Sequence, residues 1–126
     1  VFYPKFSDIS LLVNLAKHCS TVINVGSTMS LDFANFNTPG LFINYNQPQG
    51  FGWSVDVVYR FQHFRSMYGL APVGWVNSKA EIAEKVKLAL DQPDKIGPDR
   101  KKWLERIVQP DLHKTASQRI AEAILS

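Results

Sequence analysis

The sequence predicts an α/β fold, a three-layer, Rossmann-like parallel sheet of three to four strands flanked by helices. Three apolar runs, at residues 21–25, 41–45 and 71–76, are short enough to be buried strands of such a sheet. Segments with helical spacing separate them, and this alternation favours parallel crossovers. Phe2 and Tyr3 are candidates for a fourth strand. A chain of 126 residues that is 45% hydrophobic is expected to form one domain.

The first two helices are predicted from their caps and from the spacing of their apolar residues. Ser7 and Asp8 can cap a helix that ends near His18. A second helix is expected at residues 28–36, before the sequence Asn-Thr-Pro-Gly ends it. The first helix has Ile9, Leu12, Val13 and Ala16 at helical spacing, and the second is predicted to bury Leu31, Phe33 or Ala34, and Phe36.

The segment that follows the second strand is rich in glycine and aromatic residues. Residues 46–52 are predicted to form a loop, because they contain two glycines and a proline. Residues 53–68 show both strand-like alternation and helical spacing, and we favour a loop that leads into a short helix. This aromatic-rich segment can stack on the base of a ligand or close over its sugar. Alternatively, its side chains Phe51, Trp53 and Phe64 simply cover the edge of the sheet.

The C-terminal part is predicted to be mainly helical. Ser78 and Glu81 form a capping box. The helix that it opens has Ile82, Val86 and Leu90 on one stripe. Residues 91–98 are predicted to be a linker to two C-terminal helices, which we interpret as scaffold. The first carries Trp103, Leu104, Ile107 and Val108, and the second begins after Thr115 and carries Ile120, Ile124 and Leu125.

The turn Gly26-Ser27-Thr28 is the strongest candidate for a binding site. A helix that starts there presents unpaired N–H groups and the positive end of its dipole to a negatively charged group. The same residues also fit a tight turn and N-cap that bind nothing. Asp32 lies one helical turn beyond Thr28. Its carboxylate can accept hydrogen bonds from a ribose, or can simply favour the first turn of the helix.

The pattern Gly26-Ser27-Thr28-x-x-x-Asp32-x-Ala34, followed by Pro39 and an apolar strand, resembles the donor-nucleotide half of GT-B glycosyltransferases. It is most similar to bacterial enzymes of surface-polysaccharide, lipid-linked sugar and teichoic-acid synthesis, in which an acidic residue also precedes a helix-ending proline by seven positions. Residues 114–124 look like the closing helix of some of these proteins. The resemblance runs from about Asp8 to the C-terminus, and only residues 26–39 carry a specific motif.

The resemblance implies a role for each matching residue. The backbone of Gly26, Ser27, Thr28 and Met29 would bind the diphosphate, Asp32 the ribose hydroxyls, and Asn46 and Gln47 the donor sugar. Retaining members of the fold often carry two glutamates separated by seven residues, and the corresponding earlier position here is Asn24. This departure disfavours the retaining mechanism and favours an inverting one. The scheme needs no metal and no cofactor.

His63 and Arg65 are the candidate catalytic residues. The histidine can act as a general base or steady a phosphate, and the arginine can neutralise a departing diphosphate. Both also fit the description of polar residues on an exposed helix surface. The resemblance implies that the catalytic base lies on the other domain of a GT-B enzyme. Because 126 residues are too few for both domains of such an enzyme, the chain is expected to be the C-terminal, donor-binding fragment of a larger enzyme, an incomplete half of the GT-B fold without its N-terminal acceptor domain.

Charge and cysteine content restrict the remaining functions. The net charge is +3, and the tightest basic cluster, at residues 100–102, is predicted to be a solvated helix face and not a nucleic-acid site. Cys19 is the only cysteine, so no internal disulfide can form.

No run of roughly eighteen apolar residues, the length that would cross a membrane as a helix, is present. A cytoplasmic location is expected, and the mild basicity is compatible with peripheral association of the full-length protein with the inner face of the membrane.

These observations favour a glycosyltransferase that transfers a sugar from a nucleotide-diphospho-sugar to an acceptor in surface-polysaccharide or glycolipid synthesis. The fragment alone is expected to bind a nucleotide weakly and to catalyse nothing. Two alternatives keep the same architecture, a nucleotide-sugar epimerase and a CDP-glycerol-type phosphotransferase. A third is a non-catalytic Rossmann-like module that binds a protein through its aromatic loop.

Overall fold

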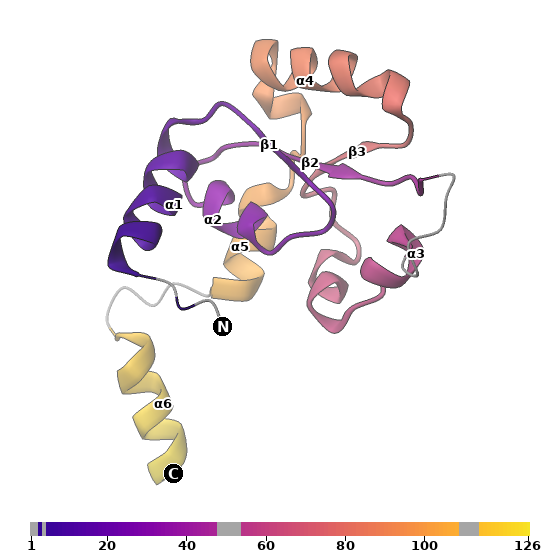
Figure 1. The fold of residues 1–126 in the computed structure, drawn as a ribbon. Helices are drawn as coiled ribbons and strands as arrows, with labels where there is room; N and C mark the ends of the chain where they lie inside the picture. Colours follow the sequence, from indigo (N-terminus) through magenta and orange to yellow (C-terminus); the bar gives the residue numbers. More distant parts are fainter. Residues whose placement is uncertain (1–2, 4, 48–53, 109–113) are drawn as a thin grey trace.

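The computed structural model describes residues 3, 5–47, 54–108 and 114–126 and shows a mixed α/β domain with a small, open parallel sheet flanked by helices (Figure 1). This confirms the predicted fold class. Three strands are present in the described part, and Tyr3 belongs to none of them, whereas Phe2 lies outside the described residues. In chain order the elements are α1 (Phe6–His18), β1 (Val22–Asn24), α2 (Met29–Ala34), β2 (Gly40–Ile43), α3 (Val55–Val58), the 3₁₀ helix η1 (Gln62–Met67), β3 (Gly74–Val76), the 3₁₀ turn η2 (Lys79–Glu81), α4 (Ile82–Asp91), the 3₁₀ turn η3 (Pro93–Lys95), α5 (Arg100–Val108) and α6 (Ala116–Leu125).

The sheet has the order β1-β2-β3, and both pairs of strands are parallel. Val22 lies opposite Gly40, and Leu41 lies opposite Gly74. Because all three strands run in one direction, the segments that follow them emerge at one edge, which we call the carboxyl edge. This is the edge at which open α/β sheets bind their ligands.

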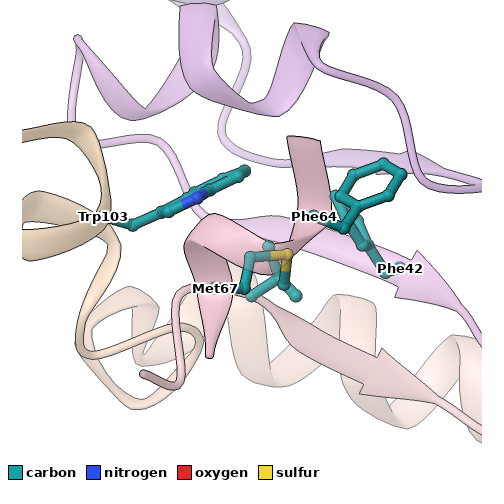
Figure 2. Close-up of a cluster of buried hydrophobic side chains, with 5 residues drawn as sticks. Phe42, Phe64, Met67 and Trp103 are labelled. Atoms are coloured by element: carbon teal, nitrogen blue, oxygen red, sulfur yellow. The ribbon is translucent and has the colours of Figure 1, made fainter. Parts of the chain in front are cut away.

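Helices cover both faces of the sheet and create two clusters of buried side chains. On one face, η1 and α5 enclose Phe42, Phe64, Met67, Val73 and Trp103 (Figure 2). On the other face, α4 and η3 enclose Leu41, Val76, Ala89 and Ile96. Neighbouring residues of β2 point to opposite faces, which explains why this central strand is apolar throughout.

Several predicted elements are confirmed, with changes in their buried faces. Residues 54–68 contain α3 and η1 and no strand, in agreement with the predicted short helix. The predicted capping box of Ser78 and Glu81 precedes α4, but its backbone partner differs. The Glu81 carboxylate accepts a hydrogen bond from the backbone N–H of Asn77 (3.0 Å). On α4 the buried position is Ala89, and Leu90 is exposed.

Two predicted apolar faces are mostly exposed in the structure. On α1 only Ala16 is buried, and Asp8, inside the first turn, caps the helix by accepting a hydrogen bond from the N–H of Lys5 (2.7 Å). Phe36 is also exposed, contrary to prediction. Helix α6 stands away from the rest of the chain, and none of its residues is buried (Figure 1). Helical spacing identifies an apolar face but not the surface that covers it.

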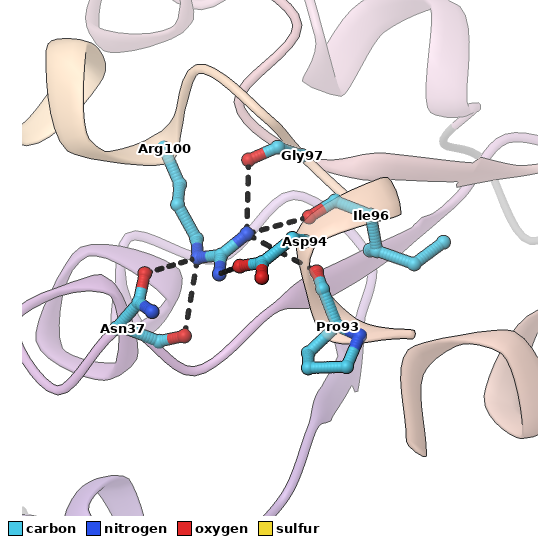
Figure 3. Close-up of polar contacts among 6 residues, drawn as sticks. All are labelled: Asn37, Pro93, Asp94, Ile96, Gly97 and Arg100. Atoms are coloured by element: carbon cyan, nitrogen blue, oxygen red, sulfur yellow. Dashed lines mark hydrogen bonds and ion pairs between the residues drawn. The ribbon is translucent and has the colours of Figure 1, made fainter. Parts of the chain in front are cut away.

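Arg100 is buried, with 4% of its surface exposed, and is therefore not part of the predicted solvated cluster. Its guanidinium lies between the α2–β2 corner and the turn that precedes α5 (Figure 3). The Nε–H group donates to both Asn37 O (3.1 Å) and Asn37 Oδ1 (2.8 Å). The Nη1 group donates to the carbonyl oxygens of Pro93 (3.2 Å), Ile96 (2.9 Å) and Gly97 (3.3 Å).

The segment predicted as a linker, residues 91–98, is a packed turn held by this guanidinium. Ile96, directly after η3, is buried beneath β3. Gly97 has φ +59°, and a Cβ atom at this position would lie 2.3 Å from Pro72 O. Only glycine fits this conformation and this close approach. The Nη2 group of Arg100 completes the set with an ion pair to Asp94 Oδ1 (3.1 Å).

Replacing Arg100 is predicted to destabilise the domain strongly. Arg100→Met removes the donors for four buried or partly buried carbonyl groups, and we expect a loss of about 2–4 kcal/mol in the free energy of unfolding. The Asp94 side chain is 91% exposed, so Asp94→Asn should cost less than about 1 kcal/mol. Lys101→Met, on an exposed position of the same helix, is the second control. Denaturant unfolding measures all three, and equal losses for Arg100→Met and Asp94→Asn would contradict the assignment to the carbonyl groups.

Candidate functional site

The carboxyl edge collects most of the residues predicted to bind a nucleotide sugar. Gly26, Ser27 and Thr28 follow β1, whereas Asn46 and Gln47 follow β2. The structure therefore places both predicted sets on one edge, as the parallel topology requires.

Some backbone N–H groups of the turn already donate hydrogen bonds to neighbouring side chains. Ser27 N–H donates to Asn24 Oδ1 (3.0 Å), and Met29 N–H donates to Ser27 Oγ (3.2 Å). Asn24 also donates through Nδ2 to Ser30 Oγ (2.9 Å). Thr28 N–H has no partner among the described residues, and its side chain does not cap α2. The diphosphate role of this backbone stays a prediction, and within the described residues Thr28 offers the one uncommitted backbone N–H among Ser27, Thr28 and Met29.

The ring of Tyr59 packs over Gly26 of the turn. The sequence did not single out Tyr59 as a site residue. A Cβ atom on Gly26, whose φ is +59°, would lie 2.9 Å from the Tyr59 ring and 2.8 Å from Val58, so only glycine fits beneath these side chains. The Tyr59 hydroxyl donates to Ile43 O (2.5 Å) at the end of β2. Burial raises the pKa of Tyr59 to about 12, although a hydrogen bond from the Gly26 backbone acts in the opposite direction. Tyr59 thus joins the carboxyl ends of β1 and β2.

A cavity of about 570 Å³ lies beside the turn, between α2, η1 and α5. We call it the His63 cavity, and its polar lining consists of Thr28, Gln62, His63, Arg65 and Ser66. It brings together three residues that the sequence singled out separately, Thr28, His63 and Arg65. Both His63 and Arg65 are exposed, so each can reach a ligand in the cavity.

The rest of the His63 cavity is an apolar wall. The side chains concerned are Leu31, Phe64, Trp103 and Ile107. Trp103 and Phe64 belong to the buried cluster on this face of the sheet (Figure 2). A cavity with one apolar wall and a few polar groups suits a ligand that carries both a ring and a charge.

Helix α5 holds η1 in place through a series of hydrogen bonds. Trp103 Nε1 donates to Ser66 Oγ (2.8 Å), and this hydroxyl donates to His63 O (2.6 Å). Arg106 Nη1 donates to the carbonyl oxygens of Ser66 (2.7 Å) and Tyr68 (2.9 Å). The segment that presents His63 is therefore fixed by α5, which the sequence suggested only as scaffold.

The remaining predicted site residues do not line the His63 cavity. Asp32 is exposed and lines a hollow between α1 and α2 together with Ile9 and Phe36, not the His63 cavity. Asn46 Oδ1 accepts a hydrogen bond from Val55 N–H (2.9 Å), so this side chain holds the start of α3. Gln47 is exposed and has no hydrogen bond to another described residue. Phe51 and Trp53 lie outside the described residues.

Among the described residues, no group of three or more His, Cys, Asp or Glu side chains could hold a metal ion. The helices in this part of the chain are all too short or too polar to cross a membrane. No protein-family model matches the chain, and no curated protein or solved structure matches it either.

Tyr59 is predicted to make the stability of the domain depend on pH in the alkaline range. Its folded pKa of about 12 lies above the value of 10.0 for a free tyrosine, so the unfolded state loses this proton first as the pH rises. The contribution of Tyr59 should be complete below pH 10 and should decline between pH 10 and 12. Urea unfolding at several pH values measures this, and Tyr59→Phe should reduce the decline. Tyr68→Phe, at an exposed ring, is the matched control; a decline unchanged in Tyr59→Phe would contradict the prediction.

Proposed function

We propose that this chain is the donor-binding part of a glycosyltransferase that transfers a sugar from a nucleotide-diphospho-sugar to an acceptor in surface-polysaccharide or glycolipid synthesis. The proposal rests on one observation, the convergence of Thr28, His63 and Arg65 on a cavity beside the carboxyl edge of a parallel sheet. The resemblance of residues 26–39 to the donor half of GT-B enzymes is independent support.

The charges of the His63 cavity fit a diphosphate. Arg65 can form two parallel hydrogen bonds to phosphate oxygens, which lysine cannot do. Thr28 adds a backbone N–H without a partner among the described residues. Among the described residues no carboxylate lines the cavity, so none of them opposes an anion with a like charge. Anion binding therefore depends mainly on Arg65, because α2 has only six residues and its first turn is partly used by its own hydrogen bonds.

The reaction is a displacement at the anomeric carbon. The acceptor oxygen forms a bond to this carbon as the bond from the carbon to the diphosphate oxygen breaks. Arg65 and Thr28 N–H stabilise the charge that develops on the leaving diphosphate. The acceptor hydroxyl gives its proton to a general base, which the resemblance places on the N-terminal acceptor domain; among the described residues of the cavity, His63 is the candidate for this role. Asn24, at the position where a retaining enzyme often carries a glutamate, favours inversion.

Arg65→Met is predicted to weaken diphosphate binding. Calorimetric titration of the full chain with uridine, cytidine and guanosine diphosphates should show binding of at least one of them. The substitution should reduce its affinity by about 1.5–3 kcal/mol, because a hydrogen bond to a charged group is lost. Arg60→Met is the matched control, since Arg60 is exposed and does not line the His63 cavity. Absence of binding for all three nucleotides, or equal weakening by both substitutions, would contradict the proposed function.

Asp32→Ala tests the predicted ribose contact separately. If Asp32 accepts hydrogen bonds from the ribose, the substitution should weaken a nucleoside diphosphate by about 1–3 kcal/mol and leave inorganic pyrophosphate unaffected. The same titration measures both ligands. Unchanged affinity for the nucleotide would remove Asp32 from the site, in keeping with its place in the hollow between α1 and α2.

A further inference from the structure

A second cavity lies on the other side of Phe64, between η1 and β3. It encloses about 340 Å³, and we call it the Trp75 cavity. Its aromatic lining consists of Tyr59, Phe64, Tyr68 and Trp75, and its other side chains are Met67 and Leu70. None of the described side chains that line it carries a charge at neutral pH, so the cavity suits a neutral ring and not an ion.

Packing fixes the plane of the Trp75 ring. The ring meets Tyr59 edge to face, with centroids 4.9 Å apart and planes at 90°, and meets Phe42 in the same way at 5.8 Å and 83°. Trp75 nevertheless keeps 36% of its surface exposed, and Tyr68 keeps 66%. Both rings therefore line the cavity with part of their surface open to a flat ligand, and the Trp75 ring is already oriented.

The rim of the Trp75 cavity offers backbone groups that can pair with the edge of a ring. Gly69 has φ +75°, and nothing lies within 4 Å of the position that its Cβ would take. Its N–H and C=O groups have no hydrogen-bond partner among the described residues. The neighbouring groups are committed, because Tyr68 O accepts from Arg106 and Leu70 N–H donates to Met67 O. One donor and one acceptor thus remain open at the rim.

The two cavities share one wall, the side chain of Phe64, which lies close to Gly26 of the predicted phosphate turn. Gly26 packs directly against Tyr59 and Phe64, so the turn touches the wall of the Trp75 cavity. The Tyr59 hydroxyl is bound to Ile43 O and stays protonated at neutral pH, and the shared wall is therefore uncharged.

We propose that the Trp75 cavity binds the base of the nucleotide, which stacks on Trp75 and Tyr68 and pairs at its edge with Gly69. This inference rests on the proposed function, and it divides the donor between a cationic cavity for the diphosphate and an aromatic cavity for the base. Stacking on aromatic side chains accepts any base, because every base has a π face. Selectivity among bases then comes from the donor and acceptor of Gly69.

The test uses ligands that contain only one half of the nucleotide. Uridine, cytidine, adenosine and guanosine report on the base, inorganic pyrophosphate reports on the diphosphate, and methyl glucoside is the control for a sugar ring. Each is titrated into the full ¹⁵N-labelled chain, and amide shifts are followed. At least one nucleoside should shift Gly69 and the indole N–H of Trp75, and pyrophosphate should shift Thr28 and Arg65.

Tyr68→Ala is the decisive variant, because this exposed side chain can be removed without creating a cavity in the hydrophobic core. It should weaken nucleoside binding about 5- to 150-fold, the range expected for loss of one base–aromatic stack, and leave pyrophosphate binding unchanged. Tyr3→Ala, at another exposed aromatic residue, should change neither. Arg65→Met should weaken pyrophosphate alone.

The results separate this inference from the proposed function. Pyrophosphate binding without any nucleoside shift at Gly69 or Trp75 overturns the base site and leaves the diphosphate site standing. Nucleoside binding that depends on Tyr68, without pyrophosphate binding, supports the base site and overturns the diphosphate site. A response of Trp75 to methyl glucoside in place of a nucleoside overturns the assignment to a base. Absence of both shifts overturns both proposals.

Discussion

The buried guanidinium of Arg100 sets the position of helix α5, because its hydrogen bonds tie the start of the helix to two other parts of the chain. One is the corner between α2 and β2 at Asn37, and the other is the turn from Pro93 to Gly97. A buried charge is costly unless its donors are satisfied. All three nitrogens of this guanidinium have partners, and most of these are backbone carbonyls that need a donor themselves.

The position of α5 in turn fixes the candidate site. Trp103 and Arg106 extend from this helix and hold η1, so His63 and Arg65 face the turn after β1 from a constrained segment. Tyr59 gives the same kind of support at the carboxyl edge, where it joins the ends of β1 and β2. A site whose polar groups are held in place by such hydrogen bonds needs little reorganisation when a charged ligand binds. The aromatic cluster beneath it serves both stability and the shape of the two cavities.

Local patterns in the sequence were sufficient to predict the helices and strands, but not the contacts between distant parts of the chain. Apolar runs predicted the three strands of the described residues, and helical spacing of aromatic residues predicted the short helix after residue 53. The burial of Arg100 could not be predicted, because no local pattern shows that carbonyls more than fifty residues apart converge on it. The parallel topology predicts that Thr28 and Asn46 share an edge, but not that η1 folds back to bring His63 and Arg65 beside Thr28. Periodicity placed α6 correctly, whereas its lack of buried residues could not be anticipated.

A crystal structure of the full chain with a bound nucleoside diphosphate would locate the anion relative to the side chains that α5 holds in place. We expect the diphosphate within hydrogen-bond distance of Arg65 and of Thr28 N–H, with η1 and α5 unchanged. A diphosphate bound in the hollow beside Asp32, or anywhere away from the His63 cavity, would contradict this expectation.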